Sequence, residues 1–124
     1  MIKIVCGVLI ISLNLLASNL SEAIDKAQTQ KKMILVELVM ASCSYCEKME
    51  KFVLSKEDVK NILDRHYVFL KLDINKEEIP ELLTSRMTPT FYFLSSDATQ
   101  VLYEIQGAPS KSEFITLLER YERK

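Results

Sequence analysis

The sequence is poor in residues that break regular structure: its 124 residues include two glycines and three prolines, and it has no tryptophan. This scarcity, beside a hydrophobic content of 48%, excludes a disordered or fibrous chain and leaves enough apolar side chains for a core. No repeat, linker or low-complexity tract divides the chain, whose length is that of one domain. The formal charge of −1 lacks the basic excess of nucleic-acid-binding domains, so we expect no nucleic-acid partner.

Histidine is almost absent, which limits the metal sites that the chain can build. A zinc site takes four protein ligands, or three and a water molecule. Cys43, Cys46 and the single histidine, His66, do not make a closed zinc set. His66 stands near the end of an expected helix, where a surface position is the simpler interpretation. We therefore expect no zinc and no resident metal.

The longest apolar run lies at the N-terminus, from Ile4 to Leu16, after a single positive charge at Lys3. Small residues follow the run, which is the layout of a secretory signal peptide. The run is shorter than the roughly 20 apolar residues of a membrane-spanning helix, although an uncleaved anchor facing the periplasm is the alternative. We assign residues 1–18 to a signal peptide and residues 19–124 to one domain, and in a bacterial cell we expect the periplasm.

Cysteine is scarce in the remaining domain. Removal of residues 1–18 also removes Cys6 and leaves only Cys43 and Cys46. An exported protein with one closely spaced pair does not depend on disulfides for its fold. A structural disulfide that closes so small a loop also gains little entropy. The pair is therefore left for chemistry.

The pattern of apolar residues predicts five helices and four strands. The first two strands are nearly continuous apolar runs, typical of strands buried on both faces, and their long right-handed crossover makes them parallel. The last two strands form an antiparallel hairpin, so the class is α/β, a mixed four-stranded sheet with helices on both faces. The expected order is helix 21–32, strand 33–40, helices 43–54 and 55–66, strand 67–74, helix 77–86, strands 90–94 and 100–105, and helix 110–124.

Serines mark the expected starts of three helices. Ser21 and Ser55 are the predicted caps of the first and third helices, the latter with Asp58 three residues on. Ser110 and Glu113 form a capping box for the last helix. In helix 77–86 we expect Ile79, Leu82 and Leu83 to point inward.

Cys43 comes just after a strand and at the expected first turn of a helix. Backbone N–H groups and the helix dipole favour an anion there, and a thiolate is such an anion. In this setting the pKa of a thiol falls from about 8.5 to about 3.5–7.5. Cys43 can then attack a disulfide of another protein. Cys46, three residues on and on the same helix face, can resolve the mixed disulfide.

A thiol pair can also bind Cu(I), because this soft ion is satisfied by two or three sulfur ligands. Met40 and Met49 lie close in sequence and could add thioethers, although such methionines more often fill the core. A copper-transferring chaperone is therefore an alternative from another class. A third is an interaction module whose thiols are incidental.

The chain resembles the thioredoxin superfamily from about Ser21 to its C-terminus. The resemblance rests on a strand followed by C-S-Y-C, on Glu37 six residues before the pair, on Pro89 in M-T-P-T, and on Q-G-A-P-S-K before the last helix. The run C-S-Y-C-E-K-M-E resembles an exported thioredoxin-related subgroup with the pattern C-x-x-C-x-x-M-E. The resemblance implies the thioredoxin fold and protein-disulfide oxidoreductase activity.

The resemblance also implies roles for single residues around substrate. Pro89 has a cis peptide bond and places the Thr88 backbone opposite Cys43, where substrate pairs as an added strand. Ser44 and Tyr45 stand where thioredoxin has Gly-Pro, and this dipeptide helps to set the redox potential. Tyr45 is either a hydrophobic contact for substrate or a shielded helix residue.

Glu37 matches the family's buried acid beneath the cysteine pair. We interpret it as a proton shuttle for Cys46, because an isolated buried carboxylate is costly unless it has a partner or takes up a proton. Lys71 matches a lysine that neighbours this acid in many relatives. The alternatives are an ordinary ion pair or a Glu37 side chain that points out of the sheet.

Our interpretation is a monomeric exported enzyme that reduces or exchanges disulfides of other proteins. It needs no cofactor besides the Cys43–Cys46 disulfide, and a membrane thiol-transfer reductase would recharge it. Ser42 stands where relatives often have tryptophan, and this departure and the Ser44-Tyr45 dipeptide leave the direction of electron flow open. A disulfide-forming oxidant is therefore the alternative within the same chemistry.

Overall fold

The computed structural model describes residues 19–122, so the predicted signal peptide lies outside the described residues. Within this range an α-helix over Ser44–Met49 continues directly into a short π-helix over Glu50–Leu54. No helix of the described range is long and apolar enough to cross a membrane. The elements are α1 (Asn19–Gln30), β1 (Met33–Val39), α2 (Ser44–Met49), η2 (Glu50–Leu54), α3 (Glu57–His66), β2 (Tyr67–Asp73), β3 (Thr90–Leu94), β4 (Val101–Gln106) and α4 (Lys111–Glu122).

The four strands form one sheet in the order β2-β1-β3-β4. β1 pairs with β2 in parallel and with β3 in antiparallel, and β3 and β4 form the antiparallel hairpin. The predicted mixed sheet, with its parallel first pair, is therefore confirmed. β1 and β3 are central, which explains why their sequences are almost wholly apolar.

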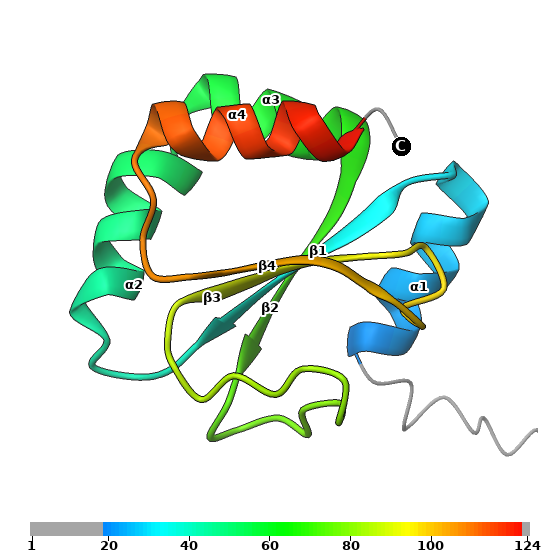
Figure 1. Ribbon diagram of the computed structural model, residues 1–124, viewed down its shortest axis with the longest axis horizontal. Coiled ribbons are helices and arrows are strands. Elements are labelled where there is room, and N and C mark those ends of the chain that lie inside the picture. Colours follow the sequence, from blue (N-terminus) through cyan, green and yellow to red (C-terminus); the bar gives the residue numbers. More distant parts are fainter. Residues whose placement is uncertain (1–18, 123–124) are drawn as a thin grey trace, which may run out of the picture.

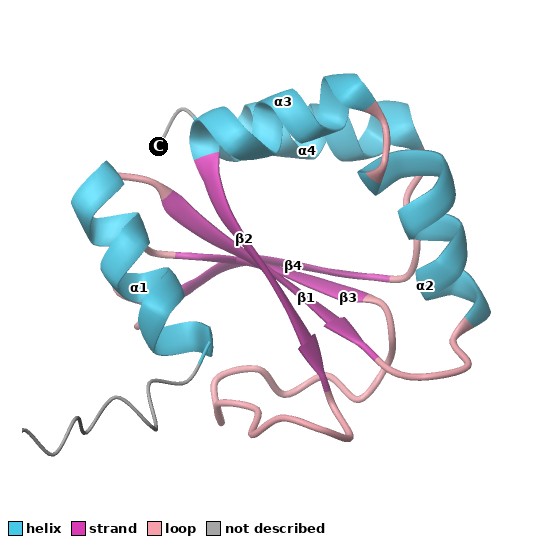
Figure 2. Ribbon diagram, turned by 180° about the vertical axis from the view of Figure 1, so that it is seen from behind, coloured by secondary structure: helices cyan, strands magenta, loops and turns pink. Residues whose placement is uncertain are grey.

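Helices cover both faces of this sheet, as predicted (Figures 1 and 2). Successive strand side chains point to opposite faces, so Leu35 and Val36 of β1 belong to two different cores. The larger core lies under α3 and α4 and contains aromatic pairs such as Phe91–Phe114. The second core lies under α1, where Ala23 and Ala27 are the buried helix positions.

The predicted helix over residues 77–86 is wrong. This segment has no helix and runs as turns and irregular chain between β2 and β3, at the bottom of Figure 1. Pro80 lies inside it, lacks an N–H group and disfavours helical geometry at the residue before it. Leu83 is buried as expected, whereas Leu82 is 37% exposed.

The predicted caps of the first and third helices are also wrong. α1 already includes Asn19, so Ser21 lies within it. Ser55 is the C-cap of the preceding helix and donates its hydroxyl to the Lys51 carbonyl oxygen at 2.9 Å. Lys56 holds the N-cap position of α3, and its side chain makes no capping hydrogen bond.

The capping box of the last helix is confirmed. The Ser110 hydroxyl accepts from the Glu113 N–H at 3.3 Å, and the Glu113 carboxylate accepts from the Ser110 N–H at 3.4 Å.

Candidate functional site

The two cysteines lie at the start of α2, just after the loop that follows β1. Cys43 is the N-cap of α2, one residue before the first turn in which it was predicted, and it forms a disulfide with Cys46. The Cα atoms of the two residues are 5.2 Å apart. The Cys46 N–H donates to Cys43 Sγ at 3.1 Å, so the cysteine sulfur serves as the cap of the helix. A thiolate at this atom would receive the same hydrogen bond, which stabilises the anion.

The loop before β3 faces Cys43. The Thr88 carbonyl oxygen lies 3.6 Å from Cys43 Sγ, and the Thr88 hydroxyl donates to the same sulfur at 3.4 Å. The Thr88–Pro89 peptide bond is cis. The Gly107 N–H donates to the Pro89 carbonyl oxygen at 2.8 Å, which connects this loop to the end of β4. Residues 45 positions apart in sequence are thereby held together around one sulfur.

Sequence reasoning missed the polar side chains that hold this loop. The Thr90 hydroxyl donates to the Met87 carbonyl oxygen at 2.7 Å and lies 2.9 Å from the Ser85 hydroxyl. The Ser85 N–H in turn donates to the Tyr92 hydroxyl at 2.8 Å. A buried threonine at the start of an apolar strand, beside a proline, was the available signal.

The two residues between the cysteines point to solvent. Ser44 begins α2 and is exposed, and Tyr45 is 59% exposed. The Lys48 ammonium lies 5.1 Å from the centre of the Tyr45 ring. Tyr45 is therefore not a shielded helix residue, and its ring is accessible to another molecule.

Glu37 lies on the sheet face that carries Leu35, the face of the larger core, and is 1% exposed. Neither of its carboxylate oxygens has a hydrogen-bond partner among the described residues. Burial raises the pKa of Glu37 from 4.5 to about 7, while Lys71 lowers this pKa and Glu50 raises it further. The side chain therefore points into the core and not toward solvent. Its carboxyl group can hold a proton near neutral pH and release it, as a proton shuttle requires.

Lys71 stands directly opposite Glu37 in the parallel register of β1 and β2. Its ammonium group nevertheless hydrogen-bonds the carboxylate of Glu50 in η2 and forms an exposed ion pair with it. Glu50 therefore takes the cation that would otherwise pair with Glu37. Sequence reasoning gave Glu50 no role, although the last position of the C-x-x-C-x-x-M-E pattern was the available signal.

Replacement of Glu50 by glutamine is expected to lower the pKa of Glu37 below 7. Two effects have the same sign: the negative charge near Glu37 disappears, and Lys71 becomes free to approach Glu37. The pH dependence of the Glu37 carboxyl signal in carbon NMR measures this pKa. Glu47→Gln, three residues earlier in α2, is the matched control for the loss of one charge. An unchanged pKa would show that the Glu50–Lys71 pair has no influence on Glu37.

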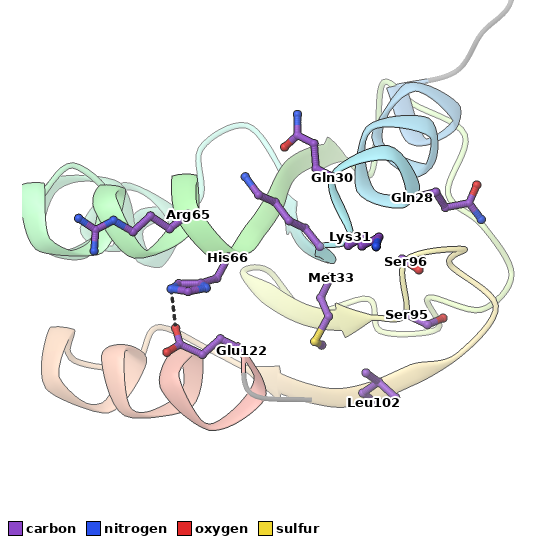
Figure 3. Close-up of a pocket in the computed structure, with 11 residues that line it drawn as sticks. Gln28, Gln30, Lys31, Met33, Arg65, His66, Ser95, Ser96, Leu102 and Glu122 are labelled. Atoms are coloured by element: carbon purple, nitrogen blue, oxygen red, sulfur yellow. Dashed lines mark ion pairs between the residues drawn. The ribbon is translucent and has the colours of Figure 1, made fainter.

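The two methionines and the histidine that the sequence offered as ligands differ in their positions. Met40 is 38% exposed, so the suggestion that it fills the core is wrong. Met49 is 1% exposed and packs in the larger core, so it fills the core as the sequence suggested. His66 ends α3 at the opposite end of the sheet, with Nε2 3.6 Å from the Glu122 carboxylate (Figure 3). Within residues 19–122 no three His, Cys, Asp or Glu side chains gather in a metal-binding geometry.

Comparison with known families and structures identifies relatives of this arrangement. A family model described as a thioredoxin-like domain matches residues 20–122. A thioredoxin from Thermus thermophilus is 27% identical, with 80% of each chain covered and a TM-score of 0.66. The C-terminal domain of Neisseria meningitidis DsbD in the reduced form is 23% identical, with 82% of this chain and 92% of that chain covered and a TM-score of 0.67. The periplasmic thioredoxin SoxS of Paracoccus pantotrophus is 18% identical, with 74% of this chain and 97% of that chain covered and a TM-score of 0.59. No curated protein sequence gave a significant match.

Proposed function

The chain belongs to the thioredoxin-like domain family, and on that premise we propose that it reduces or exchanges disulfides of exported proteins through Cys43 and Cys46. The observation that carries the proposal is the disulfide at the N-terminus of α2, with the Thr88 backbone beside Cys43 Sγ. This arrangement presents one reactive sulfur next to a backbone that a substrate can pair with. Its reactive group is the cysteine pair itself, without a further cofactor.

The reaction consists of two exchanges of sulfur–sulfur bonds. In the reduced enzyme the Cys43 thiolate attacks one sulfur of the substrate disulfide, and the other substrate sulfur leaves as a thiolate and takes up a proton. Cys46 then loses its proton and attacks Cys43 Sγ, which releases the second substrate sulfur. The enzyme ends as the Cys43–Cys46 disulfide. Counted from the dithiol form, it has lost two electrons and two protons, the first proton when the Cys43 thiolate formed and the second from Cys46. The two substrate sulfurs have gained the two electrons, and each takes up one proton from water.

Glu37 would receive the proton of Cys46 in the second exchange. Its pKa of about 7 suits this role, because the ideal general base titrates near the working pH. In the first exchange the Thr88 carbonyl oxygen and N–H are the groups that would pair with the substrate backbone, with Pro89 fixing their position. Lys71, held by Glu50, acts on Glu37 only through its charge.

The cellular setting that we propose is the periplasm, with a signal peptide over residues 1–18. One solved structure of the same fold is of a periplasmic thioredoxin, which supports this setting by analogy. Each reduction leaves the enzyme oxidised, so a dithiol donor must return two electrons. We propose a membrane thiol-transfer reductase for this step, with the enzyme working as a monomer.

The reduction potential of the Cys43–Cys46 pair tests the proposed direction. The protein would be equilibrated with glutathione buffers of known ratio, and its free thiols counted by mass after alkylation. We expect a reduction potential of about −270 mV or below, as for a reductant. A reduction potential of about −120 mV would instead identify a disulfide-forming oxidant.

A further inference from the structure

A groove of about 380 Å³ opens beside the cysteine pair, between α2 with η2 and the chain that joins β4 to α4. Its wall on the helix side carries Tyr45 and Phe52, which are 59% and 56% exposed. Such exposure of two aromatic rings is unusual in a protein that keeps its other four phenylalanines buried or half-buried. Ala108 and Pro109 form the opposite wall. Ala108 follows Gly107, whose N–H group holds the Pro89 loop, so the groove continues from the proposed substrate surface.

The rim of this groove is basic. The Lys48 ammonium lies over the Tyr45 ring, and the Lys51 ammonium lies 5.3 Å from the centre of the Phe52 ring. A third lysine, Lys111, lines the groove and pairs with Asp58 at 2.8 Å.

No acidic side chain lines the groove. Of the two acids that share the helical turns of α2 and η2, Glu50 is engaged with Lys71, and Glu47 is not among the lining residues. Lys48 and Lys51 form no ion pair among the described residues. Two exposed aromatic rings therefore lie beneath two unneutralised ammonium groups, in a chain whose formal charge is −1.

We infer that this groove binds an acidic segment of the substrate protein that carries an aromatic or aliphatic side chain and flanks the disulfide to be reduced. The apolar side chain would lie between the two rings and Pro109, and the Asp or Glu residues beside it would pair with Lys48 and Lys51. The inference rests on the proposed function and adds a substrate preference to it. Electrostatic complementarity of this kind acts chiefly on the rate of encounter and on the choice of partner.

The test uses synthetic peptides of equal length, each closed by one disulfide and flanked by Phe-Glu-Glu, Phe-Lys-Lys, Phe-Ser-Ser or Ser-Ser-Ser. The second-order rate constant of their reduction by the reduced full chain is measured, with hydroxyethyl disulfide as a reference that has no flanking segment. We expect Phe-Glu-Glu to react at least about fivefold faster than Phe-Lys-Lys, and added salt to reduce this ratio. Phe-Ser-Ser should react faster than Ser-Ser-Ser.

The variants are read as ratios between peptides, so that any change in the reactivity of Cys43 cancels. Lys48→Glu with Lys51→Glu should invert the preference between the acidic and basic peptides. Lys26→Glu with Lys31→Glu, which makes the same charge change at exposed positions on and after α1, should leave it intact. Phe52→Ser should bring the ratio of Phe-Ser-Ser to Ser-Ser-Ser close to one, and its exposed position makes loss of folding no concern.

Equal rates for all four peptides, with the reference still reduced, would overturn the groove inference and leave the proposed function standing. A reference that is not reduced would overturn the proposed function and the inference with it. Sedimentation provides two further outcomes against the inference. These are a dimer that Phe52→Ser dissociates, or binding to phosphatidylserine vesicles through Lys48 and Lys51 with no peptide preference.

Discussion

Replacement of Cys43 by serine is expected to abolish disulfide reduction, with a loss of about a thousandfold or more. A serine hydroxyl stays protonated at neutral pH and cannot displace a thiolate from a disulfide. The change is otherwise mild, because Cys43 caps α2 through its sulfur and serine is among the preferred N-cap residues. The measurement is single-turnover reduction of a disulfide peptide in a Cys6→Ser background, which leaves the redox pair as the only cysteines of the chain.

Cys46→Ser is the matched control for this result. It keeps the attacking sulfur and removes only the sulfur that resolves the intermediate. We therefore expect Cys46→Ser to accumulate a mixed disulfide with the peptide, visible as an added mass that dithiothreitol removes. Activity that survives in Cys43→Ser, or a mixed disulfide on Cys46 in that variant, would show that the roles of the two sulfurs are not those proposed.

Replacement of Glu37 by glutamine is expected to slow the second exchange by about a hundredfold at neutral pH. Glutamine has nearly the same shape as glutamate but cannot accept the proton of Cys46. The first exchange should be little affected, so the mixed disulfide should accumulate in the Glu37→Gln variant before it resolves. The rates of formation and decay of this intermediate, followed by acid quench and mass, separate the two steps. Equal decay in the variant and the wild type would remove Glu37 from the mechanism.

The same substitution is expected to stabilise the protein above neutral pH. Burial raises the pKa of Glu37 from 4.5 to about 7, so the folded state holds its proton more tightly than the unfolded chain. The stability that this proton confers is fully present below pH 4.5 and is lost as the pH rises through 7. A difference of about 2.5 pKa units corresponds to about 3 kcal/mol.

Urea unfolding of the oxidised protein at a series of pH values measures this effect. Glu37→Gln should match the wild type near pH 4, apart from a constant offset, and exceed it by up to about 3 kcal/mol at pH 8. Glu47→Gln, at an exposed position of α2, is the control and should show no such pH dependence. A constant difference between Glu37→Gln and the wild type across the series would mean that Glu37 titrates normally in the folded protein.

The proposed resolution step connects these two predictions. A carboxyl group that costs stability when ionised is retained in the centre of the sheet, where leucine would pack without that cost. A buried acid with a raised pKa is expected at a site where the reaction transfers its proton. The exposed Glu50–Lys71 pair adds little stability of its own, and its place beside Glu37 suggests that its charges act on the neighbouring acid.

Much of the fold could be predicted because local patterns carry it. The apolar run of β1 indicated a strand buried on both faces, and this prediction is confirmed. The same prediction is wrong for β2, which lies at the edge of the sheet and is only partly buried. The capping box of α4 needs only Ser110 and Glu113, three residues apart. The apolar spacing of residues 77–86 is that of a helix, but Pro80 lies inside the segment and disfavours helical backbone. The prediction failed because a local effect of one residue outweighs the apolar spacing.

The sequence by itself determined the strands, the position of the cysteine pair at a helix start, and the presence of an acid within a buried strand. These depend on residues a few positions apart. Only the tertiary structure decided which partners the charged groups take. Lys71 pairs with Glu50, which is 21 residues away in sequence, and not with Glu37. Asn19 donates a hydrogen bond to Glu77, which is 58 residues away. Contacts of this range, an ion pair in the first case and a hydrogen bond in the second, follow from which elements pack together, because the strength of a charge interaction depends on distance and burial and not on sequence separation.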